Sequence, residues 1–468
     1  MEGSRLDERS ADLLAREAGL ERRLTADQLT MIALGGAIGT GLFLGSALAI
    51  RMAGPGIILS YIFGALLAWL LTRALAEMAV AHPTAGSFGA YAELYVSPWA
   101  GFATRWSYWF AQAVVIGGDA VALSIYCGWW FPNVDSWVWI SAAGVTLFAL
   151  NARNVYQFGQ VEYLLSMIKI VAIGSFVAFG VLLLSGIIPG TPAIGLTNLT
   201  EHGGFLPMGL AGAWLAVSFV MFGFVGTEVV AVTAGEAENP AEAIPRALRN
   251  VIVRLALFYV AAVFVLVALV PWNSEPASAD ITGSPFVQVF ERVGVPAAPH
   301  LINLVVVIAA LSSMNCNLYT ATRTLFSLSR GGYAPAFLGR VSKSGIPLPA
   351  LLATGSGLLV AVILATVLPQ GAYFYLFGVA LFAALFVWLV CFISHLRFRR
   401  AWAQRTDATP PLRLRGGSSL SLFGALAIVA IMLTTWWVPA MRVTLLVGLP
   451  WLAGVSLIYF VVFRKKTP

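Results

Sequence analysis

The chain has 468 residues, of which 59% are hydrophobic and only 10% are charged. Soluble domains carry about 25% charged residues, so this composition excludes a soluble globular protein and indicates a polytopic membrane protein. The formal net charge is +7, but the basic residues lie between hydrophobic segments, which favours membrane topology over nucleic-acid binding. The three cysteines lie in apolar segments without CxxC spacing, so we expect neither a disulfide nor a metal site.

Hydropathy predicts twelve segments of membrane-spanning length. Their approximate cores are 28–50, 56–80, 100–130, 136–151, 162–187, 208–232, 250–271, 302–326, 349–368, 373–394, 421–438 and 443–463. Arginines and lysines are concentrated in alternate connections and at the C-terminus, which places both termini in the cytoplasm by the positive-inside rule. An irregular connector, 396–420, separates ten segments from a final pair.

The first hydrophobic segment contains a glycine-rich run, Leu34 to Phe43, with four glycines between Gly35 and Gly41. Glycine within a helix costs backbone entropy and leaves main-chain groups open. The run is therefore either a close-packed helix contact or an interrupted helix whose open groups face protein or water. The sixth segment repeats its Gly-Thr pattern at Gly226-Thr227. Two interruptions at matching places favour the second interpretation and indicate a transporter binding site.

Among the ionisable residues inside the predicted spans, three are singled out, because charge at bilayer depth is costly and usually faces an interior cavity. They are Asp119, Lys169 and Glu228. Asp119 is on an unbroken segment, so we expect it to reach only the side-chain end of a substrate pocket or a water within it, whereas Glu228 directly follows the second interruption. For each, the alternative is an internal ion pair that only fixes helix packing. Arg73 and Glu77, four residues apart, are expected to form an intrahelical ion pair.

The connection 82–99 contains two prolines, two glycines and four aromatic residues. It is interpreted as a short amphipathic piece lying on the helix bundle, or else as a plain turn. The sequence contains no Walker A lysine motif, no HExxH and no GxSxG. We therefore expect no enzyme activity, and we expect energy coupling through an ion gradient or exchange.

Several motifs together resemble the bacterial amino acid permeases of the amino acid–polyamine–organocation (APC) superfamily, over nearly the whole chain. The first is the run Gly35-Gly36-Ala37-Ile38-Gly39-Thr40-Gly41-Leu42-Phe43. The others are Pro83 with Gly86-Ser87-Phe88, Ala234-Gly235-Glu236-Ala237 with Asn239-Pro240, Ile244-Pro245-Arg246-Ala247, Pro271-Trp272-Asn273, Ser284-Pro285-Phe286-Val287, and Ser394-His395 with Phe398-Arg399.

The resemblance implies an all-α integral membrane protein with twelve transmembrane helices in the five-plus-five inverted-repeat (LeuT-like) fold. Helices 1 and 6 would be discontinuous. The expected organisation is a cytoplasmic tail at 1–26, a first repeat at 27–190, a second repeat at 205–396, and helices 11 and 12 at 420–463.

The resemblance also implies roles for individual residues. Thr40 and Gly41 would receive the substrate carboxylate, and the carbonyls of Ala37, Phe222 and Val225 would receive the ammonium, with Phe222 also acting as a gate. Lys169 matches a lysine on the fifth helix that replaces a sodium ion in proton-coupled relatives. The expected substrate-binding set is Ala37, Ile38, Gly39, Thr40, Gly41, Asp119, Phe222, Val225, Gly226 and Glu228, and the expected proton-coupling set is Lys169 and Glu228.

Three positions depart from the family pattern: Asp119 stands where relatives often carry glutamate, Gly223 where many carry serine, and Arg105 where many carry glycine. The first two bear on side-chain selectivity. The sequence thus predicts a proton-coupled importer of an L-amino acid in a bacterial plasma membrane, working by alternating access. The alternatives are an obligate amino acid exchanger on the same fold and an amino acid sensor.

The expected partners are a small amino acid and the lipid bilayer, without nucleic acid, and the protein would be a monomer or weak homo-oligomer. No cofactor, metal or catalytic residue is expected, and the proton would be the coupling ion. The substrate stays open, with a neutral amino acid favoured over a cationic one and an acidic one least.

Overall fold

The structure is a computed structural model. It describes residues 24–82, 87–152, 155–187, 192–232, 240–273, 286, 289, 297–342, 345–368, 371–404 and 416–464. The tail up to residue 23, residues 83–86, 234–239, 284, 285 and 287 of the quoted motifs, and residues 405–415 of the connector lie outside this part.

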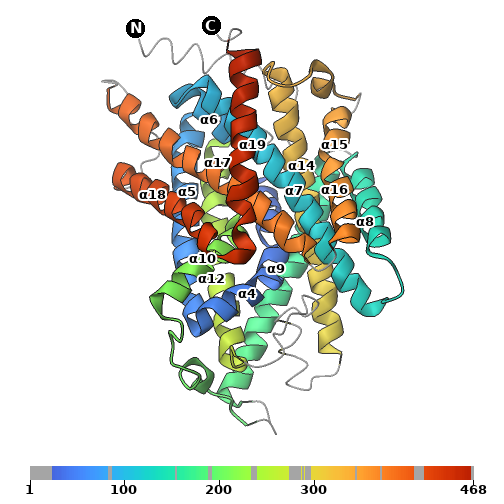
Figure 1. The fold of residues 1–468 in the computed structure, drawn as a ribbon, viewed down its shortest axis with the longest axis vertical. Helices are drawn as coiled ribbons and strands as arrows, with labels where there is room; N and C mark the ends of the chain where they lie inside the picture. The colour runs from blue at the N-terminus through green and yellow to red at the C-terminus, as the bar shows by residue number, and fades with distance from the viewer. Residues whose placement is uncertain are drawn as a thin grey trace.

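The described residues form a bundle of helices (Figure 1), of which the five longest have 30 to 33 residues. The α-helices are α2 (Ala26–Ala37), α3 (Thr40–Phe43), α4 (Gly45–Ala53), α5 (Ile57–Ala81), α6 (Ser87–Tyr95), α7 (Pro98–Trp130), α8 (Ser136–Asn151), α9 (Val155–Ser185), α10 (Gly209–Phe224), α11 (Val229–Val232), α12 (Pro240–Leu269), α14 (Ala298–Arg330), α15 (Leu348–Thr354), α16 (Ser356–Val367), α17 (Ala372–Ala403), α18 (Gly417–Thr434) and α19 (Val443–Ile458). The short 3-10 turns are η1 (Gly54–Gly56), η2 (Thr197–Leu199), η4 (Ala336–Gly339), η5 (Thr435–Trp437) and η6 (Pro439–Met441), and Tyr459–Phe463 is a π-helical turn, η7.

Local sequence signals set where the site helices begin. Thr25 caps α2 through a capping box, in which its hydroxyl accepts from the Gln28 amide and the Gln28 side chain accepts from the Thr25 amide. Ser97 caps α7 by accepting from the Ala100 amide, and Pro98 occupies the first helical position, where its missing N–H costs nothing. These caps help to position the two helices that carry much of the site described below.

Ten helices in the described part of the chain are long and apolar enough to cross a membrane. Each hydrophobic core expected from hydropathy coincides with one or more helices. The helix Ser136–Asn151 is shorter than the candidate spans, and Gly45–Ala81 forms one helical stretch that includes a turn. An all-helical, multi-pass architecture is therefore confirmed. The count of twelve spans stays a prediction.

The connection 82–99 contains a helix, α6, whose side chains are mostly buried against α7 and α17, so the first of the two interpretations is correct for residues 87–95. The expected ion pair between Arg73 and Glu77 is wrong. The buried Glu77 carboxylate instead accepts from Arg399 Nη2 at 3.0 Å and forms an ion pair with Arg399 Nε at 2.9 Å. It also lies 3.1 Å from His395 Nε2. Both partners come from α17, more than 300 residues away in sequence, so the local spacing rule could not reveal them.

The helix α7 runs through the bundle and packs against α14, α16 and α17. The helix α2 packs against α9, α12 and α14, and α10 packs against α4 and α5. The helices α18 and α19 lie on the outside, against α17, and expose many apolar side chains (Figure 1). The interior of the molecule is thus built from α2, α7, α10 and α14, and the site lies among them.

Candidate functional site

Two helical stretches are interrupted at the centre of the bundle, and the two interruptions touch. The first lies between α2 and α3, where Ile38 (φ −81°, ψ 78°) and Gly39 (φ −113°, ψ −159°) are not helical. The second begins where α10 ends, with Val225 in an extended conformation. Gly226 then has φ +105°, and a Cβ atom there would lie 2.8 Å from the carbonyl carbon of Gly36 and 2.9 Å from the nitrogen of Ala37. Only glycine allows this main-chain contact without strain.

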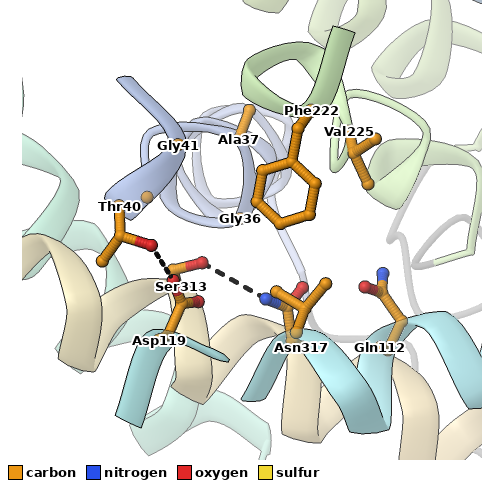
Figure 2. Close-up of a pocket in the computed structure, with 12 residues that line it drawn as sticks. Gly36, Ala37, Thr40, Gly41, Gln112, Asp119, Phe222, Val225, Ser313 and Asn317 are labelled. Atoms are coloured by element: carbon orange, nitrogen blue, oxygen red, sulfur yellow. Dashed lines mark hydrogen bonds between the residues drawn. The ribbon is translucent and has the colours of Figure 1, made fainter. Parts of the chain in front are cut away.

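A small cavity lies beside these interruptions (Figure 2). It is lined by Gly36, Ala37, Gly39, Thr40, Gly41, Gln112, Val115, Asp119, Phe222, Val225, Ser313 and Asn317. Its volume is about 10 Å³, which is room for roughly one water molecule. A ligand as large as an amino acid would therefore require lining side chains to move.

Phe222 is the lining side chain whose ring points between the two interruptions (Figure 2). Its ring stacks on that of Phe377, with centroids 3.9 Å apart. A Cβ atom on Gly41 would lie 2.8 Å from Phe222 Cδ1. Glycine at 41 therefore leaves the space that the ring occupies.

A protein carboxylate already lies at the start of α3. Thr40 Oγ1 donates to Asp119 Oδ1 at 2.5 Å, and Tyr373 OH donates to Thr40 Oγ1 at 3.3 Å. Asp119 therefore lines the cavity beside Thr40, where the substrate carboxylate is expected, and not at the side-chain end of the pocket. The rotation of α7 about its own axis decides this, and the sequence does not specify that rotation. The role of Asp119 in substrate binding stays a prediction.

The main-chain carbonyls at the interruptions have partners from neighbouring helices. Ala37 O accepts from Tyr259 OH at 2.7 Å and from the Gly39 amide at 3.0 Å. Phe222 O accepts from the Val225 amide at 3.1 Å. Because a carbonyl oxygen has two lone pairs, Phe222 O retains capacity for a further donor, whereas both lone pairs of Ala37 O are engaged here.

Lys169 lies behind the first interruption rather than in the cavity. Its fully buried ammonium group donates to Gly35 O at 2.8 Å, to Ile38 O at 3.0 Å and to Ser312 Oγ at 2.7 Å. Ser312 in turn donates to the carboxylate of Glu162. The amine and the carboxylate are thus linked through one hydroxyl, in a network that joins α2, α9 and α14.

Glu162 is the buried acidic member of this network. Its carboxylate accepts from Asn315 Nδ2 at 2.9 Å and from Ser166 Oγ at 3.3 Å. A Cβ atom on Gly35 would overlap this carboxylate, so the first glycine of the glycine-rich run makes room for Glu162. Sequence reasoning did not include Glu162 among the site residues, although its seven-residue spacing from Lys169 places both on one face of α9.

The structure brings together seven of the predicted site residues around the cavity: Ala37, Gly39, Thr40, Gly41, Asp119, Phe222 and Val225. Ile38, Lys169, Gly226 and Glu228 lie outside its lining. Glu228 is buried and accepts from the Gly226 amide at 3.1–3.2 Å and from Trp388 Nε1 at 3.3 Å. It therefore holds the second interruption in shape in this conformation.

Sequence reasoning missed three polar lining residues, Gln112, Ser313 and Asn317. Asn317 Nδ2 donates to Ser313 Oγ at 3.2 Å, and in Figure 2 Gln112 lies at the end of the cavity away from Thr40 and Asp119. Gln112 precedes Asp119 by two helical turns, and Ser313 precedes Asn317 by about one turn. These spacings place each pair on one helix face, and that was the available signal.

Helices of membrane-spanning length with two interruptions that meet beside a polar cavity are typical of membrane transporters. The sequence profile described as "Amino acid permease" matches residues 28–468. The chain belongs to the amino acid permease family, in the APC superfamily. It is therefore a multi-pass membrane transport protein and not an enzyme.

Among similar proteins is the uncharacterized amino acid permease YtnA of Bacillus subtilis, which is 38% identical over 94% of this chain and 95% of the relative. The gamma-aminobutyric acid permease of Bacillus subtilis is 37% identical over 96% of this chain and 95% of its own length. The aromatic amino acid transport protein AroP of Escherichia coli is 37% identical over 96% of both chains.

Among solved structures, the manganese transporter of Eremococcus coleocola matches with a TM-score of 0.57 at 13% identity, over 94% of this chain and 95% of that one. At this identity the likeness shows the shared fold alone.

Proposed function

We propose that this protein imports a neutral L-amino acid across a bacterial plasma membrane by proton symport and alternating access. The observation that supports this most strongly is the contact between the two interruptions beside the cavity, at Gly226 and the Gly36–Ala37 main chain. Transporter sites are typically built where discontinuous helices meet near the bilayer midplane. In this proposal both termini are cytoplasmic, and the chain has twelve spans in two inverted repeats of five plus a final pair.

In the proposed mechanism the main chain at the interruptions binds the groups that all amino acids share. The substrate carboxylate accepts from the N–H groups of Thr40 and Gly41, where the start of a helix favours negative charge. The ammonium group donates to the carbonyls of Phe222 and Val225, and to Ala37 O once Tyr259 yields its place. Phe222 moves aside to admit the substrate and closes over it afterwards.

The polar end of the cavity would set which side chains are accepted. Gln112 is 1% exposed, and neither atom of its amide forms a hydrogen bond of good geometry with another described residue, although the Tyr108 hydroxyl lies near it. Burying an amide without a partner costs free energy, and a substrate side chain that both donates and accepts would recover it. Among neutral substrates this favours those with hydroxyl or amide side chains.

Asp119 would couple the proton to the substrate. A substrate carboxylate beside Thr40 would lie close to the Asp119 carboxylate, and two ionised carboxylates so close would repel each other. The pair is accommodated when Asp119 carries a proton, so substrate and proton enter together. Lys169 and Glu228 would respond to this event, Lys169 through Ile38 O and Glu228 through the Gly226 amide.

The test is uptake into proteoliposomes that hold purified protein and no internal amino acid. With an inward proton gradient, we expect accumulation of a neutral amino acid that a protonophore abolishes. An obligate exchanger would stay silent until the same amino acid is loaded inside. Ligand-induced thermal stabilisation without transport in either format would indicate a sensor, and would contradict the proposal.

A further inference from the structure

A second, larger cavity, a groove, lies on the side of the bundle, between the last turns of α5 and the first turns of α12. It has a volume of about 580 Å³, which is large enough for a phosphate-bearing headgroup. Three arginines line it: Arg73 from α5, and Arg246 and Arg249 from α12. The cavity is separate from the central one, because the two share no lining residue.

The residues that line this groove carry a net positive charge. Three arginines and one glutamate, Glu242, give its lining a formal charge of +2. None of the three arginines forms an ion pair with a carboxylate within the part of the chain that the structure describes. Arg73 instead lies over the ring of Trp69, 5.7 Å from its centroid. Guanidinium groups in this arrangement are suited to a phosphate, which they bind with bidentate hydrogen bonds.

The two helices continue from the arginines as exposed apolar surface. On α12, Val253 and Leu257 follow Arg249 at four-residue spacing and are 60% and 63% exposed. On α5, Leu66 and Ile62 lie three and seven residues before Trp69 and are 42% and 50% exposed. Because residues three or four apart share a helix face, each helix presents a basic end and then an apolar stripe.

We propose that this groove binds an anionic phospholipid, with its phosphate among Arg73, Arg246 and Arg249 and its acyl chains along the two apolar stripes. Trp69 would lie at the level of the headgroup, where tryptophan is enriched in membrane proteins. Basic pockets between helices at the cytoplasmic face are suited to such headgroups. The groove lies toward the C-terminal end of α5 and the N-terminal end of α12, and the distribution of basic residues along the chain places these two ends at the cytoplasmic face.

The bound lipid would hold α12 against α5. The helix α12 also carries Tyr259, whose hydroxyl donates to Ala37 O at the first interruption. Stabilising α12 therefore stabilises the central site, and we expect the lipid to raise the resistance of the whole bundle to heat.

The experiment is a thermal unfolding series on the purified full chain in a neutral detergent. Phosphatidylglycerol, phosphatidylcholine and inorganic phosphate are added separately, and lipid-bound masses are counted by native mass spectrometry. We expect phosphatidylglycerol to raise the melting temperature in a saturable manner, with no rise from the other two. In the double variant R246Q/R249Q that rise should fall by half or more, and the bound phosphatidylglycerol should be lost.

The matched control is R340Q, which removes an exposed arginine outside the groove and should keep the full response. An equal rise with phosphatidylcholine would overturn the proposal, as would an unchanged response in the double variant. A rise with inorganic phosphate equal to that with phosphatidylglycerol would show an anion site without lipid specificity, which also overturns it. If the double variant fails to purify, R73Q in the same assay decides the question. No arm measures amino acid transport, so the outcome is independent of the proposed function.

Discussion

Replacing Gly226 by alanine tests the contact on which the proposed site depends. Gly226 has φ +105°, and a Cβ atom there would lie 2.8 Å from the Gly36 carbonyl carbon and 2.9 Å from the Ala37 nitrogen. All of these neighbours are main-chain atoms of α2, so no side-chain rotation relieves the overlap. We expect Gly226→Ala to separate the two interruptions.

The cost has two parts. An L-residue with a positive φ of this kind loses about 1–2 kcal/mol relative to glycine, and overpacking a tight interior contact costs about 1–3 kcal/mol. Together they give about 2–5 kcal/mol, which corresponds to a shift of roughly 30-fold to 4,000-fold in the equilibrium that holds the interruptions together.

The assay is thermal unfolding of the purified variant with and without the amino acid that stabilises the wild type. We expect a lower melting temperature and no stabilisation by ligand. The matched control is Gly118→Ala on α7, outside the lining of the cavity, where the nearest atom to an added Cβ would be Leu376 Cβ at an ordinary 3.6 Å. If Gly226→Ala behaves like Gly118→Ala, with unchanged melting and binding, the interruptions do not form the site and the reasoning fails.

Three further substitutions test the roles assigned around the cavity. Lys169→Ala removes three hydrogen bonds. We expect loss of proton-driven accumulation in proteoliposomes with exchange retained, and undiminished accumulation would show that Lys169 takes no part in coupling. Asp119→Asn removes the charge beside Thr40. The apparent affinity for substrate should rise as pH falls in the wild type and should become independent of pH in the variant. A pH dependence that persists in the variant would contradict the coupling role. Gln112→Leu should weaken the binding of hydroxyl- or amide-bearing substrates by about 5- to 150-fold, the equivalent of about 1–3 kcal/mol for a lost buried hydrogen bond, while apolar substrates keep their affinity. A uniform loss of affinity across a competition panel would show a merely structural effect.

The glycines were the part of the site that could be predicted from sequence. Gly39-Thr40 and Gly226-Thr227 stand out because several glycines within a hydrophobic segment conflict with an uninterrupted membrane helix. The conflict is local, so it is visible without knowledge of the fold. Lys169 could be identified from the sequence for a similar reason, since a lysine within an apolar segment needs a specific partner.

The polar wall of the cavity could not be predicted in the same way. Gln112 and Asn317 are polar residues on otherwise ordinary helices, and their position at the cavity follows from how α7 and α14 are rotated against α2 and α10. The same rotation placed Asp119 beside Thr40 instead of at the side-chain end. Long-range packing also decided the partners of Glu77, which are Arg399 and His395 on α17 rather than the nearby Arg73.

The interruption after α2 persists because neighbouring helices supply donors for the carbonyls that it leaves open. Gly35 O and Ile38 O accept from Lys169 on α9, and Ala37 O accepts from Tyr259 on α12. Without such donors, each carbonyl would remain unpaired in a dry interior, at a cost of several kcal/mol. The interruption therefore depends on the positions of α9 and α12. A substrate ammonium that displaces Tyr259 from Ala37 O would change the packing of α12, and a change at Lys169 would act through Ile38 O on the residue next to Ala37. In the proposed mechanism, this adjacency links a ligand bound in the cavity to the positions of α9 and α12.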